Sequence, residues 1–232
     1  MAALLAMKKL KFIAIFLLAA STAALAADLD ALRPPKGEKV ALIVFEDLEC
    51  PDCARAHPLL MEASRKYNVP VVIHDFPLPA ATPPYHAWAL EAAIAARYFE
   101  KQSFELGREF RAFVYQNQPS IGNNPSAFQA LAQHFAQQHN VTLPFALDPN
   151  GQLMAEIQKD KALGQRVGIE HTPTIYVATN QTAGQPAVEV VDRSQLFQMI
   201  EAAQRATANQ PTTKSSPKHT AHTTATTKNP GN

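Results

Sequence analysis

The stretch from Val40 to Cys53, Val-Ala-Leu-Ile-Val-Phe-Glu-Asp-Leu-Glu-Cys-Pro-Asp-Cys, decides how the rest of the chain is interpreted. Its first six residues are apolar and mostly branched, which predicts a buried strand over Val40 to Phe45. A short acidic turn, Glu46 to Glu49, follows. Pro51 suits the first turn of a helix, where a missing N–H has no consequence, so we expect a helix from about Cys50 to Lys66.

A second strand follows this helix. The helix should end at Asn68-Val69-Pro70, because the residue before a proline avoids helical geometry. Val71 to Phe76 then has the composition of a strand, until Pro77 and Pro79 stop it. Strand, helix and strand in this order form a βαβ unit, which predicts that the two strands are parallel.

Cys50 and Cys53 are the only cysteines of the chain and are spaced Cys-x-x-Cys. A purely structural disulfide would close a very short loop and remove little chain entropy. A metal site normally needs four ligands, and only His57 stands nearby as a third, so no metal is expected. A redox-active dithiol needs such a pair between the strand and the helix of a βαβ unit, and this interpretation fits best.

The chemistry of thiols assigns a role to each cysteine. The attacking species is a thiolate, and the first turn of a helix offers free N–H groups and a positive dipole end that stabilise an anion. Cys50 occupies that position and should be the nucleophile. Cys53 lies one turn further in and should resolve the mixed disulfide. We expect no cofactor besides the redox-active Cys50–Cys53 disulfide.

The rest of the chain is helical and then returns to strands. Helices are expected in four places, namely Pro83 to about Lys101, Phe104 to Gln116, a segment capped by Asn124-Pro125, and one from Asp148-Pro149 to about Gly164. Thr174 to Ala178 and Ala187 to Val191 should pair as a hairpin. Ser194 should cap a last helix that runs through Ala203.

The first 26 residues have the features of an export signal. Lys8, Lys9 and Lys11 precede an apolar run from Phe12 to Ala20, and Ala24-Leu25-Ala26 is an A-x-A cleavage site. The run is too short for a confident membrane span, although an uncleaved anchor helix is the alternative. We therefore expect residues 1–26 to be a cleaved signal peptide and the mature chain to act outside the cytoplasm, in the periplasm or a comparable oxidising compartment.

The other end of the chain has a different composition. Residues 207–232 are rich in Thr and Lys and contain no large apolar residue, which predicts a disordered tail. Each end carries three lysines and no acid. Between them stand 15 basic and 20 acidic residues, so the overall formal charge of +1 becomes −5. This balance gives no reason to expect a nucleic-acid partner.

Several of these features together resemble the DsbA-like thiol oxidoreductases of the thioredoxin superfamily. The resemblance covers roughly residues 38 to 204 and is carried by four segments. They are Ile43 to Cys53, the strand that ends in Phe76-Pro77-Leu78, the helical stretch, and Gly168 to Thr174 followed by Ile175-Tyr176-Val177. It implies an α/β protein with a thioredoxin fold and an inserted all-helical domain. Residues 27–80 and 148–206 would form the thioredoxin part, and residues 81–147 the insertion.

The resemblance also implies a substrate site opposite the dithiol. Pro173 would follow a cis peptide bond and face the cysteines, whereas an ordinary trans proline is the alternative. The backbone of Thr172 would pair with an extended segment of a client protein, as in strand addition. The Thr172 hydroxyl could also donate to the Cys50 thiolate.

Three departures from the family bear on the redox properties. The dipeptide between the cysteines is Pro51-Asp52, where familiar members have Pro-His, and an aspartate should disfavour a nearby thiolate. Val44 stands where relatives often have a buried acid, and Glu46 could replace that acid. His171 stands where relatives often have glycine, and it is either a cation near the sulfurs or an exposed loop residue.

These observations predict an exported oxidoreductase that exchanges disulfides with client proteins, with oxidation as the expected direction. Reduction or isomerisation is an alternative, because Asp52 opposes oxidising power. A thioredoxin-fold chaperone that binds peptides at Thr172 and Pro173 with an idle dithiol is another. The expected partners are exported proteins with thiols or disulfides and an unidentified redox partner, for which a membrane protein is one candidate.

Overall fold

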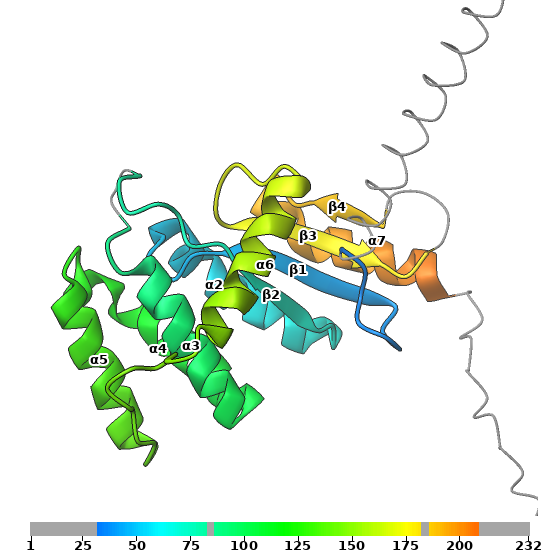
Figure 1. Ribbon diagram of the computed structural model, residues 1–232. Helices are drawn as coiled ribbons and strands as arrows, with labels where there is room; N and C mark the ends of the chain where they lie inside the picture. Colours follow the sequence, from blue (N-terminus) through cyan, green and yellow to red (C-terminus); the bar gives the residue numbers. More distant parts are fainter. Residues whose placement is uncertain (1–31, 83–85, 182–185, 209–232) are drawn as a thin grey trace, which may run out of the picture.

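The computed structural model describes residues 32–82, 86–181 and 186–208 (Figure 1). The expected signal peptide, Pro83-Pro84 and residues 209–232 lie outside these ranges. Among the described residues, no helix is long and apolar enough to span a membrane.

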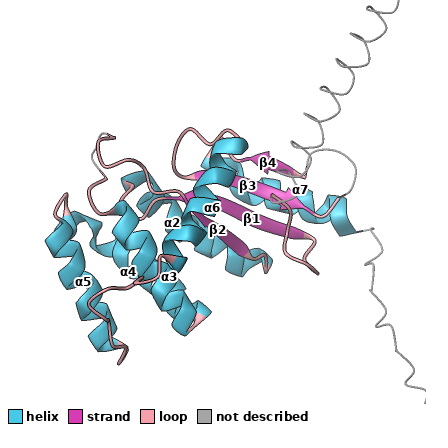
Figure 2. Ribbon diagram, in the orientation of Figure 1, coloured by secondary structure: helices cyan, strands magenta, loops and turns pink. Residues whose placement is uncertain are grey.

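A four-stranded mixed sheet, in the order β2-β1-β3-β4, forms the centre of the structure (Figure 2). The strands are β1 (Val40–Glu46), β2 (Val71–Asp75), β3 (Thr174–Thr179) and β4 (Ala187–Glu189). β1 and β2 are parallel, as the βαβ pattern predicted, and the register places Leu42 opposite Val71. β3 pairs antiparallel with both β1 and β4, so the predicted hairpin is confirmed.

Both faces of this sheet are covered, which explains why β1 is continuously apolar. Leu42 and Val44 pack with residues of α2 (Pro51–Tyr67) and α7 (Leu196–Ala208). Ile43 and Phe45 point to the opposite face and pack with residues that include Leu163 of α6 (Gln152–Arg166). Because side chains alternate along a strand, Glu46 shares the face of Leu42 and Val44, below α2.

The helical unit lies between β2 and α6 in the chain and beside the sheet in space (Figure 1). It consists of α3 (Ala89–Gln102), α4 (Phe104–Ile121) and α5 (Pro125–Gln138). Its core is a cluster of aromatic rings from these three helices, among them Phe99, Phe110, Phe128 and Phe135. Leu48 and both cysteines belong to the same buried cluster, so the dithiol lies where the helical unit meets the sheet.

Several element boundaries differ from those expected. α3 begins at Ala89, because Trp88 is its N-cap. α6 begins at Gln152 after Gly151, while the Asp148 side chain accepts a hydrogen bond from the Met154 N–H. The last helix follows a 3-10 turn, η1 (Arg193–Gln195), in which Asp192 caps the Ser194 N–H.

That last helix also ends later than expected, because α7 continues to Ala208. Thr207 is buried, and its hydroxyl donates to the Ala203 carbonyl oxygen at 2.9 Å. The side chain of Lys39 donates to the Thr207 carbonyl oxygen at 3.2 Å. Residues 207 and 208, which we expected in the tail, therefore belong to the last helix.

Candidate functional site

The two cysteines stand at the start of α2, directly below the loop that leads into β3. Cys50 is the N-cap of α2, and Pro51 occupies its first turn as predicted. Both sulfurs are free thiols and both residues are buried, Cys53 more completely than Cys50, at 2 % and 7 % exposure. The thiol that the sequence assigned as the nucleophile is therefore the more accessible one.

The pKa of Cys50 is lowered from 9.0 to about 6. The largest contribution is a hydrogen bond from the Cys53 side chain, and burial opposes it. A hydrogen bond with the Thr172 side chain and the backbone N–H groups of Cys53 and Asp52 lower the pKa further. The two N–H groups belong to the first turn of α2, where helix amides have no intrahelical partner. At neutral pH the Cys50 side chain is therefore largely a thiolate.

The environment of Cys53 has the opposite effect. Burial raises its pKa well above 9.0, and the hydrogen bond with Cys50, the charge of Cys50 and the charge of Glu46 raise it further. The Asp47 N–H, 3.5 Å from the Cys53 sulfur, opposes this shift. The pair thus consists of one ionised thiol and one protonated thiol, which is the combination needed for sequential attack.

The Thr172–Pro173 segment faces the dithiol. The Cys50 sulfur lies 3.2 Å from the Thr172 carbonyl oxygen, to which it donates a hydrogen bond when it is protonated, and the Thr172–Pro173 peptide bond is cis. The Thr172 hydroxyl is buried and, apart from its effect on Cys50, has no hydrogen-bond partner among the described residues. The structure thus brings the Cys50–Cys53 pair next to the Thr172–Pro173 pair, although Cys50 and Thr172 are 122 residues apart in the sequence.

The Asp52 carboxylate, which we expected to disfavour the Cys50 thiolate, is paired with two arginines. Its Oδ1 atom accepts hydrogen bonds from Arg193 at 2.7 Å and from Arg55 at 3.0 Å. Burial alone would raise the pKa of Asp52, but the hydrogen bond and charge of Arg193, followed by those of Arg55, lower it. The carboxylate is therefore ionised and already neutralised by cations.

Glu46, Arg111 and Asp75 form a buried ionic cluster below the dithiol. The Arg111 guanidinium donates to Glu46 at 3.1 Å and to both carboxylate oxygens of Asp75 at 2.8 and 3.1 Å. Burial raises the pKa of Glu46 to about 7, although Arg111 opposes the shift. The carboxyl group can therefore exchange a proton near neutral pH. This supports the suggestion that Glu46 replaces the acid missing at Val44.

Arg111 and its neighbour Tyr115 carry no recognisable motif, so the sequence did not single them out. Both lie on α4, one turn apart, and both are buried. Burial and the charge of Glu46 raise the pKa of Tyr115 well above 10.0. The only available signal was an arginine on the apolar face of an expected helix, which requires a carboxylate from elsewhere in the fold.

The acidic turn before Cys50 is a set of internal hydrogen-bond acceptors. Asp47 accepts from the Glu49 and Leu78 N–H groups at 2.7 and 2.8 Å, and it forms an ion pair with His86 at 2.7 Å. Glu49 accepts from the Trp88 N–H at 2.6 Å. The hydrogen bond with Asp47 raises the pKa of His86, and the nearby charge of Cys50 adds to this effect. The charges of His86 and Cys50 therefore influence each other.

The two histidines singled out from the sequence, His171 and His57, have different surroundings. His171 is 68 % exposed, and its Nε2 atom lies 3.9 Å from Glu189, so it is an exposed loop residue paired with an acid. His57 is buried against the Tyr115 ring, and burial lowers its pKa to about 4. Within the described parts of the chain, no three His, Cys, Asp or Glu side chains converge in a way that could hold a metal ion.

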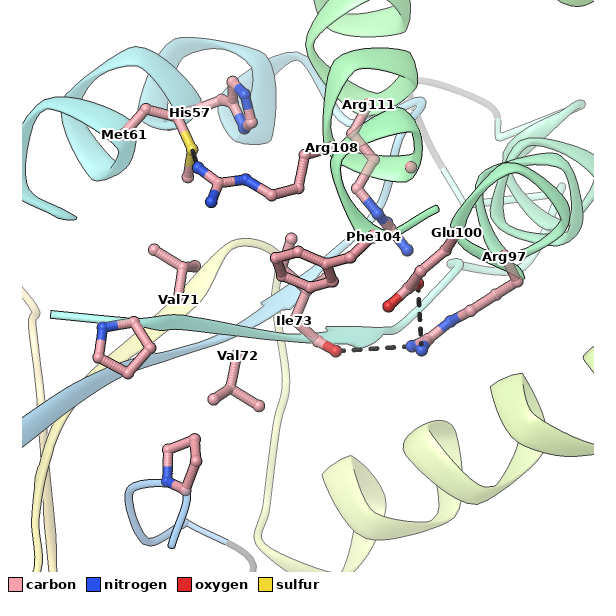
Figure 3. Close-up of a pocket in the computed structure, with 13 residues that line it drawn as sticks. His57, Met61, Val71, Val72, Ile73, Arg97, Glu100, Phe104, Arg108 and Arg111 are labelled. Carbon is pink, nitrogen blue, oxygen red and sulfur yellow. Dashed lines mark hydrogen bonds and ion pairs between the residues drawn. The ribbon is translucent and has the colours of Figure 1, made fainter. Parts of the chain in front are cut away.

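A hollow of about 340 Å³ lies between α2, β2 and α4 (Figure 3). His57 and Met61 of α2, Val71 and Ile73 of β2, and Arg108 and Arg111 of α4 are among its lining residues. Neither cysteine lines it. Arg111 connects the hollow to the ionic cluster, and the hollow is not part of the dithiol site.

In a comparison with protein families, the family described as Thioredoxin matches residues 37–196 of the chain. The matched range contains both cysteines, the cis-proline loop and the whole helical unit. No curated protein matches the sequence.

Solved structures confirm the expected fold. A variant of α-DsbA1 from Wolbachia pipientis superimposes with a TM-score of 0.61 and is 20% identical in sequence. The match covers 78% of this chain and 98% of that chain. ScsC of Proteus mirabilis has a TM-score of 0.57 and 23% identity, over 83% and 88% of the two chains. A periplasmic thioredoxin-like protein of Salmonella enterica has a TM-score of 0.55 and 19% identity, over 74% and 88%. At these identities the likeness establishes the fold, including the helical insertion.

Proposed function

The chain belongs to the thioredoxin family, and from this premise we propose that it is a thiol–disulfide oxidoreductase whose working group is the Cys50–Cys53 pair. One observation carries the proposal. A thiol with a pKa of about 6, which contacts the Thr172 carbonyl oxygen, stands beside a shielded thiol with a raised pKa. A structural cysteine pair has no need of such a difference, whereas exchange chemistry depends on it.

The proposed direction is oxidation of client proteins. A client thiolate attacks the Cys50 sulfur of the Cys50–Cys53 disulfide, so a mixed disulfide forms and Cys53 leaves with two electrons and takes up a proton. A second client thiolate attacks the mixed disulfide, and Cys50 leaves as a stable thiolate. The client gains a disulfide, and the protein is left as a dithiol that a separate redox partner must reoxidise. The low pKa of Cys50 favours its departure and therefore this direction.

Glu46 is the proposed proton carrier for Cys53. The Cys53 sulfur needs a proton when it leaves and must lose that proton when the disulfide forms again. Glu46 acts on the pKa of Cys53 through its charge, and its own pKa of about 7 suits proton exchange at neutral pH. The Thr172 backbone would pair with an extended client segment beside the dithiol, as in strand addition.

Exchange with glutathione tests the proposed function. The reduced protein should react with oxidised glutathione at a rate that follows the thiolate fraction of Cys50. That rate should rise with pH through a midpoint near pH 6 and then level off, because a thiol of lowered pKa loses its proton at a lower pH. An unperturbed thiol would still gain reactivity above pH 8. The change Cys50→Ala should abolish the reaction. A variant lacking Cys50 that reacts as fast as the wild type would refute the assignment.

Export is part of the proposal and has its own test. It is supported by the order of lysines, apolar run and A-x-A site in the first 26 residues. Protein isolated from its native cell should have Ala27 as its first residue, which mass spectrometry of the intact chain measures. A soluble protein that keeps Met1 would contradict export by a cleaved signal.

A further inference from the structure

We propose that Arg193 is a positioning residue for the dithiol: it neutralises Asp52 and so removes the penalty that an aspartate between the two cysteines would place on the Cys50 anion. The inference deepens the proposed function and rests on it for its redox consequence. Arg193 lies 140 residues after Cys53 in the chain, in η1, and only the fold brings it to the start of α2.

The contact between Arg193 and Asp52 involves two groups of the aspartate. Arg193 Nη2 donates to the carboxylate at 2.7 Å, and Nη1 donates to the Asp52 carbonyl oxygen at 3.3 Å. A guanidinium that binds two acceptors at once fixes their relative orientation, which a single ion pair would not do. Arg193 therefore holds both the side chain and the backbone of Asp52.

The Asp52 backbone is itself part of the dithiol site. Its N–H is one of the two amides of the first turn that lower the pKa of Cys50. The clamp keeps this donor in place while it directs the carboxylate toward two cations. The carboxylate is 39 % exposed, so it is only partly screened by water, and a free anion at that position would act on a thiolate in the same turn.

Arg55 is a weaker partner of the same carboxylate. It lies on α2, three residues after Asp52, and its side chain is 69 % exposed against 36 % for Arg193. Exposed ion pairs between neighbouring turns of a helix contribute little. The difference makes Arg55 a matched control, since it carries the same charge to the same oxygen without contacting the Asp52 carbonyl group.

The test is a mutant cycle on the Cys50 pKa, read from thiolate absorbance against pH. The change Arg193→Gln should raise this pKa by about half a unit to one unit, because the Asp52 charge is then uncompensated. The disulfide should become less oxidising, with the equilibrium against glutathione shifted about three- to fivefold at pH 7, or about 14–21 mV. The double change Arg193→Gln with Asp52→Asn should bring the pKa back to near the wild-type value.

Three further variants separate the proposal from a merely structural role. Arg193→Lys should keep most of the effect, since it keeps the charge. Arg55→Gln should shift the pKa by less than half as much as Arg193→Gln. Asp52→Asn alone should lower the pKa, because two cations are left without a partner. This last variant tests the proposal even if Arg193→Gln does not fold.

Two results would overturn the inference. One is an unchanged Cys50 pKa in both Arg193→Gln and Asp52→Asn. The other is an equal shift in Arg193→Gln with and without Asp52→Asn, which would show that Arg193 does not act through Asp52. Because the absorbance titration needs no client and no turnover, it gives an answer even if the chain fails to exchange disulfides, so the two proposals fail separately.

Discussion

The change Arg111→Met should lower the free energy of unfolding by about 3–5 kcal/mol at neutral pH. Arg111 is the cation between two buried acids, Glu46 and Asp75, and all three side chains are at most 3 % exposed. Without it, two carboxyl groups remain in an apolar environment with one fewer compensating charge. Methionine fills a similar volume, so the loss reports the charge and not a cavity. Denaturant unfolding followed by circular dichroism measures it.

The loss in the free energy of unfolding caused by Arg111→Met should depend on pH in a defined direction. Loss of Arg111 raises the folded-state pKa values of Glu46 and Asp75, because its charge lowers both in the native protein. A group that holds its proton more tightly when folded favours the folded state at low pH, and this stabilisation is lost as pH rises. The difference in the free energy of unfolding between Arg111→Met and wild type should therefore be smaller at pH 5 than at pH 8. A difference that does not vary with pH would contradict the electrostatic explanation.

Arg108→Met is the matched control for this experiment. Arg108 lies on α4 one turn before Arg111, where its guanidinium contacts the Met61 sulfur at 3.3 Å and lies over the Phe104 ring. It is partly exposed, so its loss should cost about 1 kcal/mol or less. Equal losses for the two variants would show that the ionic cluster has no special role.

The change Cys53→Ala should convert transient mixed disulfides into stable ones. Cys50 can still attack a client disulfide, but the thiol that would release the client is absent. The lifetime of the mixed disulfide should extend to minutes or hours, the range of uncatalysed disulfide rearrangement. Non-reducing electrophoresis of protein from the native compartment should show new bands that disappear with reductant. The change Cys50→Ala should give none, and bands from that variant alone would reverse the two roles.

The change Cys53→Ser separates two effects of Cys53→Ala, namely loss of the resolving thiol and loss of the hydrogen-bond donor to Cys50. Cys53 is the main cause of the low Cys50 pKa, because its side chain donates to the Cys50 sulfur. Cys53→Ala removes this donor and should raise the Cys50 pKa, which slows the first attack near neutral pH. Cys53→Ser keeps a donor, so it should trap clients faster than Cys53→Ala at pH 7. Equal trapping rates would show that the donor does not matter.

The local order of the chain could be derived from the sequence because it depends on neighbouring residues. The branched run at Val40 to Phe45, Pro51 at the start of α2, and Asn124 before Pro125 in α5 each specify a strand or a helix start by local sterics and hydrogen bonding. The parallel pairing of β1 with β2 followed from the strand–helix–strand order of a βαβ unit. The position of Cys50 at the helix N-terminus followed in the same way.

The charges around the dithiol could not be derived, because their partners lie far away in the chain. Composition could not show that Asp52 would meet Arg193, or that Glu46 would meet Arg111. Ion pairs of this kind form only when packing brings distant elements within a few ångströms, and the sign of a pKa shift depends on that packing. The sequence by itself determined the βαβ unit and the position of its dithiol. Only the tertiary structure decided that the acid between the cysteines is neutralised and that a buried carboxyl group lies below them.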